Sequence, residues 1–146
     1  MPDVPAVLFD VNALVALSLT THGHHGAAHR YLATIRGGWA TCPRTEAALY
    51  RLLLNPAVTG AARRSADVTS ILAGMRRDPR WSFLTDASTL TDPLIDTAVL
   101  AGHQQVTDLH LVNLAAHHGA VLATFDGALT TWLAPADRRH LILIPA

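Results

Sequence analysis

Two apolar runs in this sequence each end in an aspartate. The first is Ala6-Val7-Leu8-Phe9-Asp10 and the second is Ala120-Val121-Leu122-Ala123-Thr124-Phe125-Asp126. Neither run alternates regularly with polar residues and each has about the length of a strand, which indicates strands buried on both faces of a sheet. A carboxylate at the end of such a strand loses hydration that something must offset. Because open α/β sheets build their sites at the carboxyl ends of strands, the two aspartates predict one acidic pocket.

The composition is that of a folded domain with few charges. The chain has 146 residues, of which 50% are hydrophobic and 15% are charged, so we expect one domain over residues 1–146. No apolar run reaches the roughly 20 residues that cross a bilayer, and the N-terminus lacks the basic segment of a signal peptide. Cys42 is the single cysteine, which excludes an intrachain disulfide. We therefore expect a cytoplasmic protein without membrane association.

The choice of charged residues excludes several chemistries. All 11 basic residues are arginines, and Glu46 is the single glutamate. Without lysine there is no P-loop phosphate ligand, no Schiff base and no lysine general base. The formal net charge is zero, which excludes a globally basic surface for nucleic acid. A polyanion would have to be held by local arginines or by metal ions.

Strand and helix signals alternate along the chain. Besides the run to Asp126, strands are predicted at residues 6–10, 39–41, 81–84 and 141–144. Helices are predicted over residues 13–20, 27–35, 44–54, 60–75, 92–101, 108–118 and 128–133. Thr107 is a candidate cap for the helix that follows it. This alternation predicts a mainly parallel sheet covered by helices on both faces.

Four carboxylates fall at positions that such a sheet brings together. Asp10 and Asp126 follow strands, whereas Glu46 and Asp108 stand in the first turns of predicted helices. Each has a structural alternative, since Asp10 can cap a helix, Asp126 can form a turn, and an acid suits a helix N-terminus. Strand carboxyl ends and the N-termini of the following helices share one edge of a parallel sheet. All four carboxylates can therefore converge.

Converging carboxylates predict a site for a divalent cation. Their mutual repulsion would force some of them to protonate unless a cation is bound. Oxygen ligands suit Mg²⁺ or Mn²⁺, and these ions activate water and stabilise negative charge on phosphorus. The sequence therefore favours metal-dependent hydrolysis of phosphodiester bonds. Asp96, near another predicted helix start, is a candidate supporting acid.

Four short motifs resemble those of the PIN-domain ribonucleases. They are Leu8-Phe9-Asp10-Val11-Asn12-Ala13-Leu14, Thr45-Glu46, Val106-Thr107-Asp108 and Ala123-Thr124-Phe125-Asp126, and they occur in the family's order. Within the PIN domains the chain resembles the VapC-type toxins of bacterial toxin–antitoxin pairs. Its compact length carries this narrower resemblance, together with the segment His22–His25, Pro43-Arg44-Thr45-Glu46 and the turn His117-His118-Gly119.

The resemblance implies a fold, a site and partners. The fold would be a three-layer α/β/α sandwich around a five-stranded, mainly parallel sheet. The activity would be that of a Mg²⁺- or Mn²⁺-dependent endoribonuclease that cuts transfer or ribosomal RNA and inhibits translation. The partners would be a second copy of the chain and a cognate antitoxin that occludes the site. The implied catalytic acids are Asp10, Glu46, Asp108 and Asp126, of which the three aspartates are the implied metal ligands, with Asn12 and Thr124 as supports.

One position departs from the pattern of the family. Some PIN domains carry a further acid just after the last motif aspartate, whereas Gly127-Ala128-Leu129 follows Asp126 here. A second firmly bound metal would lack this ligand, so one metal and two metals both stay open at this stage.

Other side chains suggest contacts outside the four acids. The four histidines between residues 22 and 29 are open to three interpretations: a zinc site, a solvated loop, or a contact with RNA through His25. Arg44 lies two residues before Glu46 and is a candidate for pairing with an RNA phosphate.

Two rival functions share part of this pattern. A haloacid-dehalogenase-like phosphatase also places an aspartate after its first strand, but it needs a second acid where Asn12 stands and a phosphate-binding lysine. A catalytically weak PIN-like module would bind RNA or protein without cutting. Metal-dependent attack by water predicts products with 5′-phosphate and 3′-hydroxyl ends, which separates the nuclease from both rivals.

Overall fold

A five-stranded parallel sheet forms the centre of the computed structural model, which describes residues 4–146. The strand order is β3-β2-β1-β4-β5, and every pairing is parallel. This confirms the predicted parallel sheet. The signal-peptide prediction rests partly on residues 1–3, which lie outside the described residues. The strands are β1 (Val7–Phe9), β2 (Trp39–Thr41), β3 (Trp81–Phe83), β4 (Val121–Thr124) and β5 (Leu141–Leu143).

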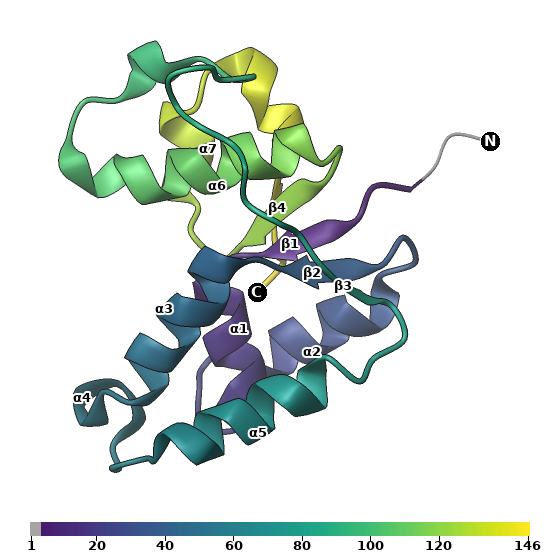
Figure 1. Ribbon diagram of the computed structural model, residues 1–146, viewed down its shortest axis with the longest axis vertical. Helices are drawn as coiled ribbons and strands as arrows, with labels where there is room; N and C mark the ends of the chain where they lie inside the picture. Colours follow the sequence, from purple (N-terminus) through teal and green to yellow (C-terminus); the bar gives the residue numbers. More distant parts are fainter. Residues whose placement is uncertain (1–3) are drawn as a thin grey trace.

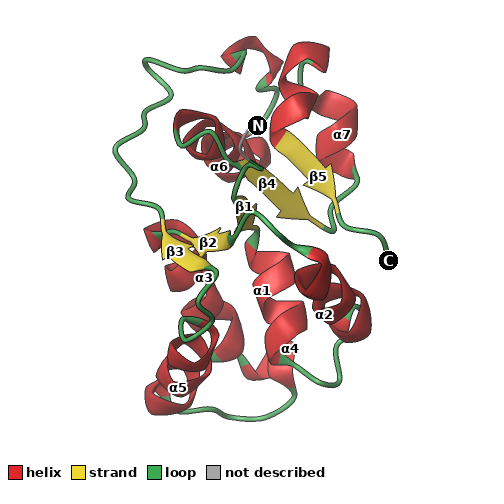
Figure 2. Ribbon diagram, turned by 90° about the vertical axis from the view of Figure 1, so that its right-hand side faces the viewer, coloured by secondary structure: helices red, strands yellow, loops and turns green. Residues whose placement is uncertain are grey.

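Helices cover both faces of the sheet and give the predicted three-layer sandwich (Figures 1 and 2). In Figure 1, α6 and α7 lie on one side, and α1, α2, α3 and α5 lie on the other. The α-helices are α1 (Val11–Ser18), α2 (His25–Thr34), α3 (Pro43–Leu53), α4 (Pro56–Thr59), α5 (Ser65–Met75), α6 (Val106–His117) and α7 (Ala128–Trp132). Short 3-10 segments are η1 (Thr97–Val99), η2 (His103–Gln105) and η3 (Pro135–His140).

Alternate residues of the central strands enter two separate hydrophobic cores. Val7 and Phe9 of β1 pack with α1, α2, α3 and α5 in one core. Leu8 between them packs with α6 and α7 in the other core. The same alternation assigns Ala123 of β4 to the first core and Leu122 to the second. Continuous apolar strands are needed because both faces of the sheet are covered.

The carboxyl edge of the sheet collects the segments that carry the acids. Asp10 directly follows β1, and Asp126 follows β4, the strand that pairs with β1. On the other side of β1, strand β2 leads through Cys42 into α3 and its Glu46. Asp108 stands in the first turn of α6. The fold therefore brings all four elements to one edge.

Three predicted helix details are wrong. The segment 92–101 has only the 3-10 turn η1, because the side chain of the buried Asn113 of α6 accepts a hydrogen bond from the Leu94 N–H at 2.9 Å. The predicted helix 60–75 starts at Ser65. Thr107 lies inside α6 and does not cap it, since the helix starts at Val106 directly after η2.

Candidate active site

Asp10 is both a cap of α1 and a buried acid at the centre of the edge. It is 5% exposed, and its Oδ1 accepts a hydrogen bond from the Val11 N–H at 2.7 Å. Its Oδ2 accepts one from the Thr124 hydroxyl at 2.8 Å. Burial raises the pKa of Asp10, the Thr124 and Val11 hydrogen bonds lower it, and the charge of Asp126 raises it, for a net upward shift. The capping interpretation and the site interpretation thus both hold for this residue.

Thr124 and Asn12 join the two strand-end aspartates. The Thr124 hydroxyl donates to Asp10, and it accepts hydrogen bonds from Asn12 Nδ2 at 2.9 Å and from the Asp126 N–H at 3.0 Å. Asn12 Nδ2 also lies 3.4 Å from Asp10 Oδ2, and Asn12 Oδ1 accepts from the Phe125 N–H at 3.2 Å. One donor and two acceptors exhaust a hydroxyl, so Thr124 is fully used in holding this network.

Asp126 presents an exposed carboxylate on a well-held turn. Its Oδ1 accepts from the Ala128 N–H at 3.0 Å, which is the turn geometry that the sequence offered as the alternative. The adjacent Phe125 stacks on the ring of His24, with ring centroids 4.4 Å apart and an interplanar angle of 10°. The other carboxylate oxygen of Asp126, Oδ2, has no hydrogen bond within the described part of the chain.

The pKa of Asp108, in the first turn of α6, depends on the charges of the other two aspartates. Burial raises its pKa, and the negative charges of Asp10 and Asp126 raise it further, to about 6. Carboxylates perturb one another in this way only when they lie close together. The three aspartates therefore share one electrostatic environment.

Glu46 is held separately, by groups on the neighbouring strands. Its Oε2 accepts a hydrogen bond from the Thr41 hydroxyl at 2.5 Å, and its Oε1 lies 3.7 Å from the Arg76 guanidinium. Arg76 lies over the ring of Trp81, 4.2 Å from the centroid, and Trp81 Nε1 donates to the Thr41 hydroxyl at 3.0 Å. Through these contacts, Glu46 and the three side chains form a closed ring of four.

The sequence did not point to Thr41, Arg76 or Trp81 as site residues. A signal was present for Thr41, because it ends β2 as Thr124 ends β4, each beside an acid. No sequence pattern identifies Arg76 and Trp81 as site residues, since they come near Glu46 only through the packing of α5 and β3.

Asp96 and the histidines lie in other surroundings. Asp96 Oδ1 accepts from the Ala98 N–H at 2.9 Å and caps η1, and its supporting role at the site stays a prediction. The His25 ring donates to the Ala16 carbonyl at 2.8 Å, and the His29 ring to the Leu17 carbonyl at 3.1 Å. Both rings thereby satisfy carbonyls in the last turn of α1.

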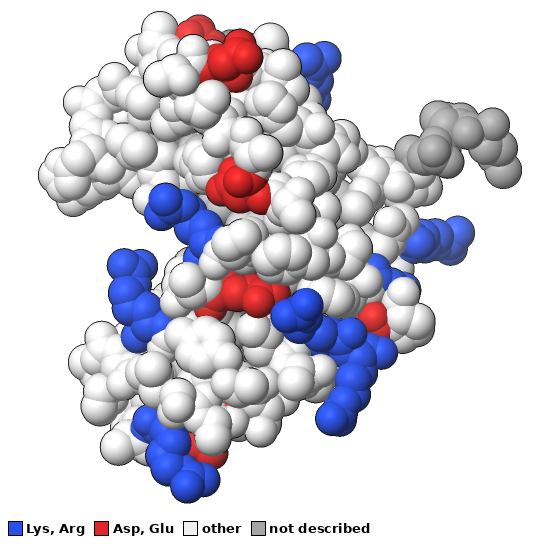
Figure 3. All heavy atoms as spheres, viewed as in Figure 1, with Lys and Arg blue, Asp and Glu red and all other residues white. Residues whose placement is uncertain are grey.

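The three aspartates influence one another electrostatically without forming a closed set of ligands. Among residues 4–146, no three His, Cys, Asp or Glu side chains are arranged to hold one metal ion. Figure 3 shows acidic side chains in the middle of one face, with arginines on several sides of them. No helix in the same range is long and apolar enough to cross a membrane.

Comparison with known proteins places this geometry in a family. No family model matches the chain. The chain is 42% identical over 125 residues to ribonuclease VapC38 of Mycobacterium tuberculosis, covering 85% of this chain and 87% of that protein. The chain belongs to the VapC ribonuclease family. Ribonuclease VapC39 of the same species is 39% identical over 128 residues, covering 84% of this chain and 89% of its own.

A solved structure confirms the fold of this VapC-family chain. The crystal structure of Mycobacterium tuberculosis VapC20, described as a sarcin-ricin loop cleaving toxin, aligns with a TM-score of 0.57. The alignment covers 86% of this chain and 94% of VapC20, at 14% sequence identity. The predicted PIN-like sandwich is therefore confirmed at the level of the fold.

Proposed function

We propose that this VapC-family ribonuclease cuts RNA with a Mg²⁺ or Mn²⁺ ion that Asp10, Asp108 and Asp126 hold directly or through water molecules. The observation that carries this proposal is the Thr124 hydroxyl, which joins Asp10 to the Asp126 backbone by hydrogen bonds. Burial and the charges of these two aspartates also raise the pKa of Asp108 to about 6. Three acids that repel one another, two after buried strands and one in the first turn of α6, are destabilising unless a cation offsets their charge.

The donor atoms fit such an ion. The set consists of carboxylate oxygens, which are the ligands that Mg²⁺ and Mn²⁺ prefer. A carboxylate can accept about four hydrogen bonds or ligand contacts, so Asp10 keeps capacity beyond Val11, Thr124 and Asn12. When bound, the cation would neutralise charge on the scissile phosphate and lower the pKa of a water molecule.

The protein side chains supply orientation and a proton acceptor. Thr124 and Asn12 fix Asp10 and the Asp126 turn relative to each other. Glu46, held by Thr41 and Arg76, would be either a further metal ligand or the group that orients the attacking water and accepts its proton. Because water attacks the phosphate in line, the RNA 2′-hydroxyl takes no part, and the products end in 5′-phosphate and 3′-hydroxyl.

The substrate and partners are proposed from the relatives. VapC20 is described as a sarcin-ricin loop cleaving toxin. We propose a structured RNA, transfer or ribosomal, as the substrate here, and the cytoplasm as the place of action. Membership of the family supports a cognate antitoxin that occludes the site, and a homodimer as the working form.

Cleavage by purified protein tests this function. Wild-type protein should cut a structured RNA in Mg²⁺ and lose the activity in EDTA, and Asp10→Asn should be folded but inactive. Asp92→Asn, an exposed aspartate in the β3–α6 connection, is the matched control and should cut like the wild type. A 2′,3′-cyclic phosphate product, or full cleavage in EDTA, would refute the mechanism. RNA binding without metal-dependent cutting would instead favour the non-catalytic PIN-like module.

A further inference from the structure

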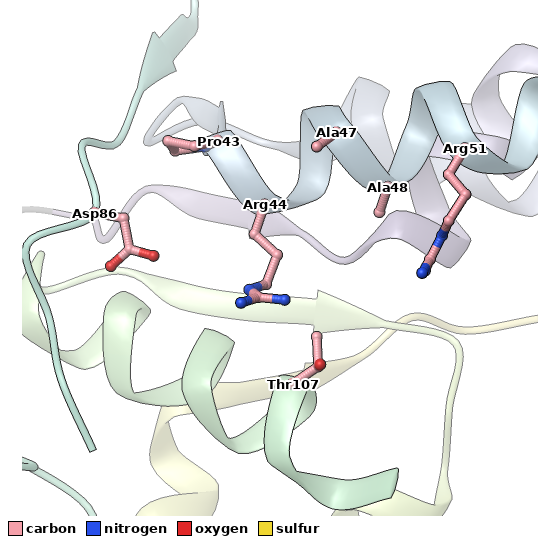
Figure 4. Close-up of a pocket in the computed structure, with 7 residues that line it drawn as sticks. All are labelled: Pro43, Arg44, Ala47, Ala48, Arg51, Asp86 and Thr107. Carbon is pink, nitrogen blue, oxygen red and sulfur yellow. The ribbon is translucent and has the colours of Figure 1, made fainter. Parts of the chain in front are cut away.

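One face of α3 places two arginines on either side of two alanines. Arg44, Ala47, Ala48 and Arg51 follow the i, i+3, i+4, i+7 spacing that puts side chains on one helix face. They line a groove of about 500 Å³ together with Pro43, Asp86 and Thr107. In Figure 4, both arginine side chains extend from α3 toward the side where Thr107 of α6 lies. The alanines leave a shallow floor between two positive groups.

The two guanidinium groups carry charge that the described residues do not neutralise. Within residues 4–146, neither Arg44 nor Arg51 forms an ion pair or a side-chain hydrogen bond. The acid in the groove, Asp86, is already engaged, since its Oδ2 lies 2.6 Å from His110 Nε2 and its Oδ1 accepts from the Ser88 hydroxyl at 2.9 Å. The groove is therefore suited to an anion.

The groove reaches the first turn of α6, which carries Asp108. Thr107 lines the groove and directly precedes Asp108, whereas Glu46 lies on another face of α3 from Arg44, because residues two apart on a helix do not share a face. Arg44 and Arg51 are seven residues apart, which at 1.5 Å per residue separates their backbones by about 10 Å along α3. One small anion cannot bridge that distance easily, whereas a chain of phosphates can present one anion to each arginine.

We propose that this groove binds the phosphodiester backbone of the RNA strand next to the cleavage site, with Arg44 and Arg51 pairing with two separate phosphates. The inference rests on the proposed nuclease function. A guanidinium pairs bidentately with phosphate, and such contacts fix the register of a strand without reading its bases. An acidic protein segment fits less well, because the groove lacks the large apolar side chains that anchor peptides.

Salt-dependent RNA binding tests the proposal. The probe is a short fluorescently labelled single-stranded RNA, titrated in Mg²⁺ against Asp10→Asn protein so that it stays uncut. Adding Arg51→Ala or Arg44→Ala should weaken binding to RNAs of any sequence and reduce the slope of log affinity against log salt by about 0.7. The double substitution should reduce that slope by about 1.4. Arg138→Ala, which precedes β5 at the opposite edge of the sheet, should leave the slope unchanged.

A conservative substitution separates charge from geometry. Arg51→Lys should keep the salt slope, because the charge is retained, but should bind less tightly because a lysine cannot pair bidentately. Circular dichroism and thermal unfolding show whether each variant is folded. If an alanine variant does not fold, the comparison of Arg51→Lys with the unsubstituted Arg51 protein still tests the proposal.

Two results would overturn the groove assignment. One is an unchanged salt slope in folded Arg44→Ala and Arg51→Ala proteins. The other is loss of antitoxin binding with RNA binding intact, which would make the groove a protein-docking site. Wild-type cleavage in Mg²⁺ is measured in parallel. If cleavage fails while the slopes change as expected, the nuclease proposal is wrong and the groove remains an RNA-binding site.

Discussion

At the scale of single residues, the hydroxyl of Thr124 determines how the two strand-end aspartates are held. Thr124→Val keeps the shape of the side chain but removes three hydrogen bonds, to Asp10, Asn12 and the Asp126 N–H. Leaving buried polar partners unsatisfied costs about 1–3 kcal/mol. We expect a loss of unfolding free energy of that size and a strong loss of cleavage. Urea unfolding measures the first and RNA cleavage the second.

Thr131→Val is the matched control for this prediction. Thr131 is exposed, and its hydroxyl contacts only a carbonyl within its own helix, that of Ala128. Its replacement should change neither stability nor cleavage appreciably. Equal behaviour of the Thr124 and Thr131 variants would show that the network does not hold the site.

Asp108 makes the stability of the metal-free protein depend on pH in an unusual direction. Its pKa is about 6 in the folded protein, against an ordinary value of 3.8 for an aspartate. The folded state therefore binds this proton more tightly than the unfolded state does. In EDTA, stability should rise as pH falls from neutral through about 6, and Asp108→Asn should remove that rise. Thermal unfolding at a series of pH values measures it, and a flat profile for the wild type would contradict the assigned repulsion.

Single residues also show what the sequence can and cannot reveal about a site. Asp10 and Asp126 were predictable because each is a charged residue at the end of an apolar run. Such a position can be recognised in the sequence without knowledge of the fold. No local sequence pattern indicates that Thr41, Arg76 and Trp81 form a ring with Glu46. Its members come from three elements and become neighbours only when α5 and β3 pack beside α3.

At the scale of elements, the packing of α3, α5 and β3 sets the orientation of Glu46. Arg76, at the end of α5, pairs with Glu46 of α3 and lies over Trp81 of β3. The Arg76 side chain is 43% exposed, so the ion pair itself contributes only about 0–1 kcal/mol to stability. We expect Arg76→Ala to lower the catalytic rate much more than the unfolding temperature. Single-turnover cleavage and thermal unfolding separate the two effects.

Arg77→Ala provides the control for Arg76. Arg77 is the next residue and is also exposed, but no ion pair joins it to Glu46 in the described part of the chain. If both variants cut RNA at the wild-type rate, Arg76 has no positioning role. If both lose activity equally, the arginines act as a general positive surface and not through Glu46.

The connection from β3 to α6 shows why one predicted element failed. Pro93 is a typical start signal for a helix, yet the chain runs as an extended loop past the sheet (Figure 2). Its backbone groups are taken by distant side chains: Asn113 accepts from the Leu94 N–H, and Asp137 accepts from the Asp96 N–H at 2.8 Å. A local pattern cannot reveal partners that lie about 20 and 40 residues away. The buried strands were predictable because their signal is local and apolar.

At the scale of the whole molecule, the sheet concentrates negative charge at one edge of a chain whose formal net charge is zero. Asp10 and Asp126 raise the pKa of Asp108 there, Arg76 pairs with Glu46, and Arg44 and Arg51 line a groove on α3. A cation bound at that edge would therefore stabilise the entire fold, because β1, β4 and α6 each contribute one of the proposed ligands. This links metal binding to global stability and not to local order alone.

Adding Mg²⁺ should raise the unfolding temperature, and the increase should depend on pH. At a Mg²⁺ concentration about 100 times its dissociation constant, binding to the folded state adds about 2.7 kcal/mol, and each kcal/mol shifts the unfolding temperature of a chain of this size by roughly 2–4 °C. A proton on Asp108 competes with the ion, so the increase should shrink as pH falls through about 6. Asp108→Asn should show a much smaller increase at neutral pH, while Asp92→Asn should match the wild type. Equal increases in the wild type and in Asp108→Asn would place the ion elsewhere.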